Sequence, residues 1–247
     1  MSNLLVVDWD YFFANPMESG DTTDERFWLF DWGHQESVLM RDIIWGTRAP
    51  SFLKFGLELP GVTVPENWWD RFNIADDAVI EVSDSNMYSG LAGDGAEFEH
   101  VWLYDAHHDL YRIKTLADFR HYMDRGIITC EDWMFVHHGN ESKLHWRWPQ
   151  WHIGGKDVRK TIPKWVGCDA RKDDMGKLDI EFDTVSICRS GSWVPPWCDE
   201  QFERFYLSCP GGEVIQVDDV DLKRDFDIEE CREFAEKMKA MEAGARG

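Results

Sequence analysis

VWLYDAHHD, at residues 101–109, is the stretch of the sequence that says most about the fold. Its four apolar residues are typical of a short strand buried on both faces, as strands are in parallel sheets covered by helices. Its polar residues follow where such a strand ends, which is where ligands bind in open α/β sheets. Because alternate side chains of an extended chain point the same way, we expect Asp105, His107 and Asp109 to converge.

Other short apolar runs end in polar residues in the same manner. They are residues 4–7 before Asp8 and Asp10, residues 78–82 before residues 83–86, residues 127–130 before Glu131 and Asp132, and residues 184–188 before Arg189 and Ser190. Between these runs, a capping-box pattern at Thr115 begins a helix that stops at Gly126, and residues 228–242 form a charged amphipathic helix. The sequence therefore predicts one α/β domain over residues 1–247, with a mostly parallel sheet.

The composition is that of an acidic, folded protein. The 247 residues include 26 Lys and Arg against 47 Asp and Glu, a formal net charge of −21, and 43% of them are hydrophobic. Phosphate contacts need cationic surface, so we do not expect nucleic acid as a partner, whereas cationic substrates and metal ions suit the charge. No apolar run approaches the roughly 20 residues of a membrane span and no secretion signal is present, so we expect a cytoplasmic protein with its six cysteines as free thiols.

Residues 143–172 depart from the acidic pattern. They carry eight Lys and Arg against two Asp, with four Trp interleaved. We favour the interpretation that they form an insertion whose Trp side chains pack on the sheet and whose cations offset the surrounding acid. The alternative is a lid or a surface for an acidic partner, such as a nucleic-acid strand bound by stacking and phosphate contacts.

The polar residues at two strand ends suit a metal site. Asp105, His107 and Asp109 form a mixed oxygen and nitrogen donor set of the kind that binds Mn²⁺ and other divalent ions, and Asp8 and Asp10 add two carboxylates. Without metal, these carboxylates would repel one another and raise each other's pKa. Two divalent ions would neutralise them and could hold a hydroxide between them. An acidic turn or a helix cap explains either motif alone, but the two together favour metal.

Both motifs resemble those of the arginase and agmatinase superfamily, in which Asp105–Asp109 matches a DAHxD motif and Asp8–Asp10 a DxD motif. VVDWDYFFANP at 6–16, WLYDAHHDL at 102–110 and SICRSGSWVPP at 186–196 resemble, more closely, the small arginase-related family that includes peptide arginases. The resemblance implies a three-layer αβα fold and a hydrolase that converts arginine side chains of peptides to ornithine and urea. In that superfamily the DxD strand follows the DAHxD strand, whereas here the DxD strand comes first. The resemblance therefore also implies a permuted strand order.

The resemblance also implies a ligand set for two Mn²⁺ ions, with Fe²⁺ or Zn²⁺ as alternatives. Asp8 and Asp105 would bridge the ions, Asp109 would bind one, and His107 and Asp10 the other. The family has a His ligand at the end of a further strand, where this sequence has Asn86. One ion would then be held by weaker ligands, unless His34 supplies the missing nitrogen; a hydrogen-bonded loop histidine is an equal alternative for His34.

Several further residues are candidates for catalysis or substrate binding. Asp105 is assigned to catalysis through the metal, and His137 or His138 could pass a proton to the leaving amine, because the usual pKa of histidine lies near neutral pH. For either one alone, a structural loop histidine is the interpretation we favour. The candidates for binding an arginine-containing peptide or a small cationic substrate are Glu131, Asp132, Arg189 and Ser190. For Arg189 and Ser190, which could hold a substrate carboxylate or backbone carbonyl, a salt bridge and a helix cap are equal alternatives.

Two other functions fit the same residues. The metal site could hydrolyse an amide, as deacetylases of related fold do. Alternatively, Asn86 marks a decayed site in a binding protein whose partner contacts the basic, Trp-rich residues 143–172. Metal content and urea release separate these hypotheses.

Overall fold

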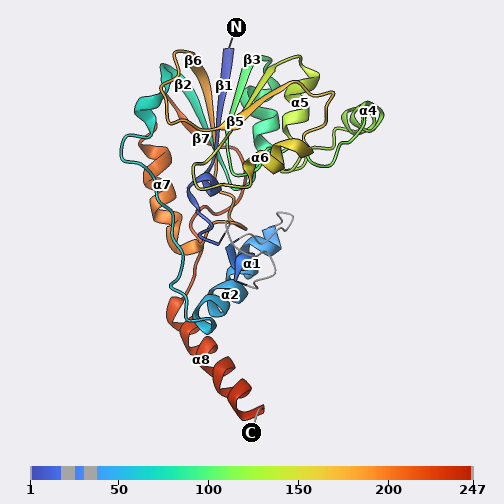
Figure 1. The fold of residues 1–247 in the computed structure, drawn as a ribbon. Coiled ribbons are helices and arrows are strands. Elements are labelled where there is room, and N and C mark those ends of the chain that lie inside the picture. Colours follow the sequence, from blue (N-terminus) through green and yellow to red (C-terminus); the bar gives the residue numbers. More distant parts are fainter. Residues whose placement is uncertain (1, 18–25, 31–37, 246–247) are drawn as a thin grey trace.

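The computed structural model describes residues 2–17, 26–30 and 38–245, and it contains one sheet of seven parallel strands (Figure 1). The order of the strands across the sheet is β5-β4-β3-β1-β6-β2-β7. Their bounds are β1 (Ser2–Asp8), β2 (Asn73–Ser83), β3 (Phe98–Tyr104), β4 (Lys143–Trp148), β5 (Cys168–Lys172), β6 (Glu181–Cys188) and β7 (Val214–Gln216).

The helices flank the sheet or lie beyond its carboxyl ends. Their bounds are α1 (Phe27–Phe30), α2 (Val38–Lys54), α3 (Ala92–Gly95), α4 (Leu116–Asp124), α5 (Met134–Gly139), α6 (Gly155–Val158), α7 (Asp199–Leu207) and α8 (Ile228–Ala245). Helices α2 and α8 contact each other below the carboxyl ends of the strands, and α8 projects away from the sheet (Figure 1). None of the helices within the described ranges is long and apolar enough to cross a membrane.

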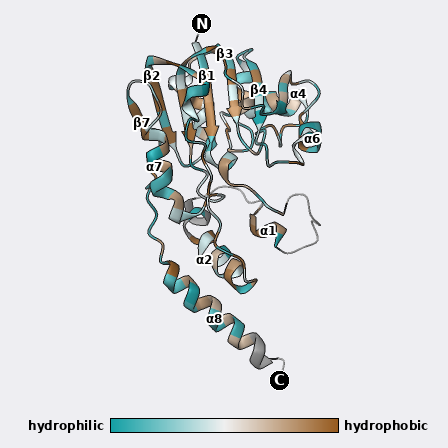
Figure 2. Ribbon diagram, turned by 60° about the vertical axis from the view of Figure 1, so that its left-hand side comes forward, coloured by the Kyte–Doolittle hydropathy of each residue, from teal (hydrophilic) through white to brown (hydrophobic). Residues whose placement is uncertain are grey.

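Two hydrophobic cores, one on each face of the sheet, make the fold a three-layer αβα arrangement. Leu5 and Val7 of β1 belong to the core that includes side chains of α2 and α7, whereas Leu4 and Val6 belong to the core that includes side chains of α5. This division follows from the alternation of side chains along a strand. Burial on both faces explains why β1 is a continuous apolar run, and Figure 2 shows hydrophobic residues gathered in the strands.

The central position of β1 brings the two acidic motifs together. Strand β1 lies between β3 and β6, and Val7 is in register with Tyr104 of β3. Asp8 is in register with Cys188, the last residue of β6. The chain segments that follow β1, β3 and β6 therefore leave the sheet side by side.

Two segments differ from the sequence-based expectation. Residues 127–130, predicted as a strand, have no regular structure or form a turn before α5. Residues 143–172, interpreted as an insertion, contain β4 and β5 and so complete one side of the sheet, with Trp146 and Trp148 in the core. By contrast, α4 begins after an N-cap at Thr115 and is followed by Gly126 at φ +61°, as the sequence predicts.

The sequence did not reveal β4 because two of its polar side chains, Arg147 and His145, pack flat on the sheet. The guanidinium of Arg147 lies 4.6 Å from the ring centroid of Trp102 and donates to Asp169 on β5 at 2.6 Å. His145 stacks on the same indole at 4.0 Å between ring centroids. Charged residues that are paired and stacked in this way occupy places on a strand that an apolar pattern does not reveal.

His145 should make the free energy of unfolding depend on pH. Burial lowers its pKa to about 4, so below the usual value near 6.5 the folded protein binds a proton less readily than the unfolded chain. Stability should therefore fall as the pH decreases from about 6.5 towards 4. In His145→Phe, which keeps an aromatic ring on Trp102, we expect the loss between pH 7 and pH 5 to be smaller than in the parent by about 1–2 kcal/mol.

Urea denaturation at several pH values measures this difference. His121→Phe on the exposed surface of α4 is the matched control and should follow the parent. An unchanged pH dependence in His145→Phe would refute the assignment.

Candidate metal centre

One cavity of about 420 Å³ at the carboxyl ends of the strands is lined by all five residues of the two acidic motifs. Asp8 ends β1, and Asp10 lies in the 3₁₀ turn Trp9–Phe12 that follows it. The remaining three follow β3 directly, and they are Asp105, His107 and Asp109. The structure thus brings together the side chains that the sequence predicted to converge.

Backbone amides hold the carboxylates in place. Asp8 Oδ1 accepts a hydrogen bond from the amide of Asp10 at 3.0 Å, and Asp105 Oδ1 accepts one from the amide of His107 at 2.6 Å. Each carboxylate therefore fixes the turn that presents the next ligand in its own motif. This local pattern, with an acceptor two residues before the donor, is the Asx turn that Asp favours at the end of a strand.

Three side chains from the two motifs could hold a metal ion. His107 Nδ1 lies 2.9 Å from Asp10 Oδ2 and 3.5 Å from Asp105 Oδ1. One ligand atom from each residue lies within 4.8 Å of the other two. Two carboxylates and one imidazole, with open cavity beside them, match the preference of Mn²⁺, Fe²⁺ and Zn²⁺ for oxygen and nitrogen donors.

Asn86 lies between three carboxylates of the cavity, those of Asp8, Asp105 and Asp109. Its Nδ2 donates to Asp8 Oδ2 at 2.7 Å, to Asp105 Oδ2 at 3.1 Å and to Asp109 Oδ2 at 3.1 Å. Ser89 Oγ donates to its Oδ1 at 3.3 Å. The amide hydrogens thus face the point where three carboxylate oxygens meet, and a rotation of the amide by 180° would direct an oxygen there instead. That rotated form is favourable only with a cation between the four oxygens.

Burial and mutual repulsion control the charges of this cluster. Burial, together with the negative charges of Asp10, Asp8 and Asp109, raises the pKa of Asp105 well above its usual value. Burial also raises the pKa of Asp109 to about 7. His107 is different: burial lowers its pKa, but the charge of Asp10 and the hydrogen bonds to Asp10 and Asp105 together outweigh burial and raise the pKa well above its usual value. A bound cation would relieve the repulsion that these shifts express.

Ser190 completes the cavity, whereas Arg189 does not reach it. Ser190 has a φ of +51°, and its Oγ donates to Asp8 Oδ2 at 2.6 Å. The side chain of Arg189 is fully buried and pairs with Asp84 at 2.6 Å and with Asp199 at 3.3 Å. Of the two alternatives for Arg189, the structure has the salt bridge and not substrate binding, because its guanidinium is enclosed by these carboxylates.

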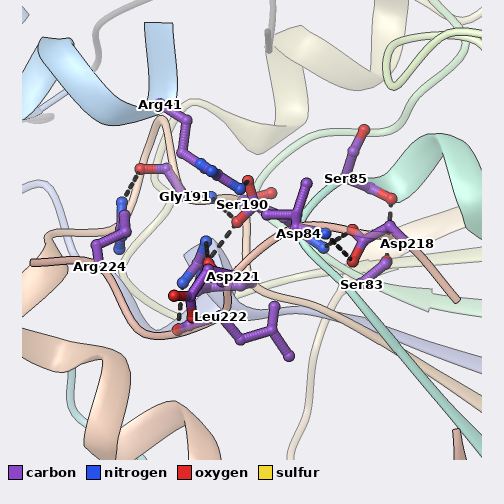
Figure 3. A network of polar contacts seen from close by, with 12 residues as sticks. Arg41, Ser83, Asp84, Ser85, Ser190, Gly191, Asp218, Asp221, Leu222 and Arg224 are labelled. Carbon is purple, nitrogen blue, oxygen red and sulfur yellow. Dashed lines mark hydrogen bonds and ion pairs between the residues drawn. The ribbon is translucent and has the colours of Figure 1, made fainter. Parts of the chain in front are cut away.

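The ion-pair network around Asp84 instead fixes the loop that carries Ser190 (Figure 3). The amide of Gly191 donates to Asp84 Oδ1 at 3.2 Å, and Arg224 donates to the Gly191 carbonyl. A Cβ on Gly191 would lie only 2.5 Å from Asp84 Oδ1, so the loop can approach the network only with glycine here. The amide of Asp84 is in turn held by Asp218 at 2.7 Å.

The predicted proton shuttles lie outside the cavity. His137 is buried in α5, where its Nε2 is 2.8 Å from the carbonyl oxygen of Ser89. His138 packs against the rings of Phe119 and Trp165. Both histidines therefore have structural positions, and the shuttle role is not supported for either. His137 does bear on the site indirectly, since it contacts Ser89, the residue that hydrogen-bonds the Asn86 amide.

Glu131 and Asp132, the two acidic residues after residue 130, have different positions, and only Glu131 lines the cavity. Glu131 lines the cavity and pairs with Arg112 at 2.6 Å. Asp132 does not line it and instead accepts from the amide of Arg112 and the hydroxyl of Thr129, at 2.8 and 3.1 Å. Only Glu131 is placed to contact substrate. His34, the alternative metal ligand, lies outside the described residues.

Several residues of the site were not expected from the sequence. Trp133 does not line the cavity, but its Nε1 donates to Asp109 Oδ2 at 2.5 Å and so holds a carboxylate of the cluster. Among the residues that line the cavity, Trp193 lies in the segment 186–196, close to Ser190. No motif in the sequence assigned the remaining ones to the site, and they are Tyr111, Cys130, His152 and Val158. His152 and Val158 belong to residues 143–172, whose interpretation as a peripheral insertion left no reason to place them here.

Comparison of the chain with protein-family models, with curated proteins and with solved structures finds no match in any of the three. The geometry of the cavity therefore carries the functional argument. It provides an Asp, Asp and His donor group, a cluster of carboxylates joined through Asn86, and an acidic wall.

Mn²⁺ should stabilise the parent protein and fail to stabilise Asp105→Asn. Asp105 contributes one oxygen to the group with His107 and the other to the contact with Asn86, so its loss weakens any metal position here. An ion that binds only the folded state adds about 2.7 kcal/mol at a concentration a hundred times its Kd. Thermal unfolding with Mn²⁺ and with a chelator measures the shift.

The control is Asp132→Asn, a buried carboxylate outside the cavity, which should keep the Mn²⁺ shift of the parent. In the chelator, Asp105→Asn should be no less stable than the parent, because it removes a repelled carboxylate. Equal Mn²⁺ shifts in the parent and in Asp105→Asn would exclude this site.

Proposed function

We propose that the chain is a metal-dependent hydrolase of C–N bonds that acts on the guanidino group of an arginine side chain within a peptide, giving ornithine and urea. The observation that carries the proposal is the group of Asp10, Asp105 and His107 at the wall of an acidic cavity. These residues belong to the DAHxD and DxD motifs. We infer the type of reaction from the resemblance of these motifs to the arginase-related family.

Asp10, Asp105 and His107 are the residues that would hold a divalent ion, with Mn²⁺ as the expected metal and Fe²⁺ or Zn²⁺ as alternatives. When bound there, such an ion supplies Lewis-acid activation of a water molecule for attack on a carbon bonded to nitrogen. A second ion would use Asp8, Asp105, Asp109 and the rotated amide of Asn86. Trp133 and Ser190 hold two of these carboxylates in position.

The charge of the cavity supports a cationic substrate without a free carboxylate. Asp8, Asp10, Asp105, Asp109 and Glu131 all line it. A guanidinium forms strong paired hydrogen bonds with carboxylates, and Glu131, which pairs with Arg112 at 2.6 Å, places one more carboxylate in the wall. Among the described residues no Lys or Arg lines the cavity, and His107 already contacts Asp10, so the carboxylate of free arginine would meet mostly like charge. Arginine within a peptide bond avoids that repulsion.

A binding protein with a decayed metal site is the second candidate, and Asn86 is the observation that favours it. Its three hydrogen bonds satisfy the carboxylates without any ion. In that case Mn²⁺ would not bind at physiological concentration, and the cavity would bind a cationic side chain without hydrolysing it.

Replacement of Asn86 by a carboxylate should make the protein dependent on metal. In Asn86→Asp, the three hydrogen bonds are lost and a further negative charge faces Asp8, Asp105 and Asp109. We expect lower stability than the parent in a chelator, by about 2–4 kcal/mol, and a larger gain on addition of Mn²⁺. Calorimetric unfolding and the metal content after dialysis give both values.

Asn140→Asp at the exposed end of α5 is the matched control and should behave as the parent. An Mn²⁺ response of Asn86→Asp no larger than that of the parent would remove Asn86 from any metal position.

The Mn²⁺-loaded protein should release urea from an acetylated, amidated peptide that contains arginine. Free arginine should react with a kcat/KM at least tenfold lower, because its carboxylate enters a cavity lined by five acidic side chains and by no Lys or Arg among the described residues. Asp105→Asn should release no urea. A urea assay, with mass spectrometry of the ornithine product, measures each rate.

Failure of every arginine derivative with metal bound would reject this function. Acetate release from an acetylated amine by the same preparation would indicate the deacetylase reaction in its place.

A further inference from the structure

A second cavity of about 280 Å³ adjoins the carboxylate cavity and has a different character. The two share part of their wall, including His107 and Trp193. The rest of the second cavity, called here the aromatic lobe, is lined by the rings of Phe13, Phe27, Phe30 and Trp151, together with Asn15, Gly154 and Asp157.

The rings of the aromatic lobe are held by contacts outside it. Phe13 packs edge-on against Trp45 of α2 at 6.0 Å between ring centroids, and Phe30 packs edge-on against Phe52 of the same helix at 4.8 Å. Trp151 Nε1 donates to the carbonyl oxygen of Tyr11 at 2.8 Å. The lobe is therefore formed before any ligand enters, which lowers the entropic cost of binding.

The loop that carries Trp151 is fixed to the sheet at both ends. It leaves β4 after Trp148 and turns back over the same side chain at Gly155. A Cβ on Gly155 would lie 2.5 Å from the Trp148 ring, so the loop can pass this close only with glycine. His152, next to Trp151, lines both cavities. The loop thus spans the boundary between the acidic and the aromatic space.

We propose that the aromatic lobe binds an apolar side chain adjacent to the target arginine, so that the substrate is a peptide in which arginine has an aromatic or branched neighbour. This inference rests on the proposed function, because the carboxylate cavity must hold the arginine side chain. The shared wall at His107 and Trp193 puts the two spaces within reach of neighbouring residues of one peptide. Ring side chains favour an apolar occupant, since burial of apolar surface drives binding.

The test compares three short peptides with blocked ends, Gly-Arg-Gly, Phe-Arg-Gly and Gly-Arg-Phe, on the Mn²⁺-loaded full chain. We expect one of the two Phe peptides to exceed Gly-Arg-Gly in kcat/KM by about tenfold to a hundredfold, and the side of the preference reveals the direction in which the peptide lies. In Trp151→Leu, that ratio should fall by at least about threefold.

Trp165→Leu is the matched control, because Trp165 belongs to the same basic segment and its Nε1 also donates to a backbone carbonyl, at 3.1 Å, but it lines neither cavity. Its ratio should equal that of the parent. If urea is released equally from all three peptides, the proposed function stands and the role of the aromatic lobe is refuted.

A binding measurement distinguishes failure of the proposed function from failure of the proposed role of the aromatic lobe. The same peptides with ornithine in place of arginine are titrated calorimetrically with the parent and with both variants. If no peptide yields urea, the proposed function fails, and a preference for a Phe-containing peptide that Trp151→Leu reduces would still support the lobe. Equal affinities for the three peptides would overturn the lobe in either case.

Discussion

Four carboxylates crowded at the ends of adjacent parallel strands are the constraint on which the rest of this structure depends. Strand β1 lies between β3 and β6, so the register that pairs Val7 with Tyr104 also brings Asp8 close to Asp105. These oxygens are buried, and their charges repel one another in a medium that screens them poorly. The surrounding residues are best understood by how they compensate that repulsion.

The repulsion between the carboxylates is compensated mostly by hydrogen bonds from neutral side chains. These bonds do not cancel the negative charge, which can therefore still attract a cation. Asn86, Ser190 and Trp133 donate hydrogen bonds to carboxylate oxygens without adding positive charge. His107 is the one cationic partner among the described residues of the cavity wall, and it contacts Asp10. Of the arginines near the site, Arg189 is enclosed by its own carboxylates, and Arg112 pairs with Glu131 and does not line the cavity. A site built in this way attracts a metal ion or a cationic side chain far more than an anion.

The sequence predicted the strands that are buried on both faces, because they appear as apolar runs. It did not predict features in which the burial of a polar or charged side chain depends on tertiary contacts. The apolar runs of β1, β2, β3 and β6 and the convergence of both acidic motifs followed from parallel-sheet geometry. Strand β4 did not, because Arg147 looks solvent-exposed until Trp102 and Asp169 are seen beside it. The position of His137 in the core was equally hidden, since its depth depends on the packing of α5.

The central place of β1 also determines when the cavity can form during folding. Both of its neighbours come later in the chain, and β6 begins only at Glu181. Contacts so distant in sequence must overcome a large loop-closure entropy before they add stability, which slows folding. Until β6 has docked, β1 presents an apolar, unpaired edge of the kind that invites aggregation or chaperone binding. The order of the strands thus ties the arrival of Ser190 and Asn86 at the carboxylates to the docking of β6, because Ser190 follows β6 and β2 reaches β1 only through β6.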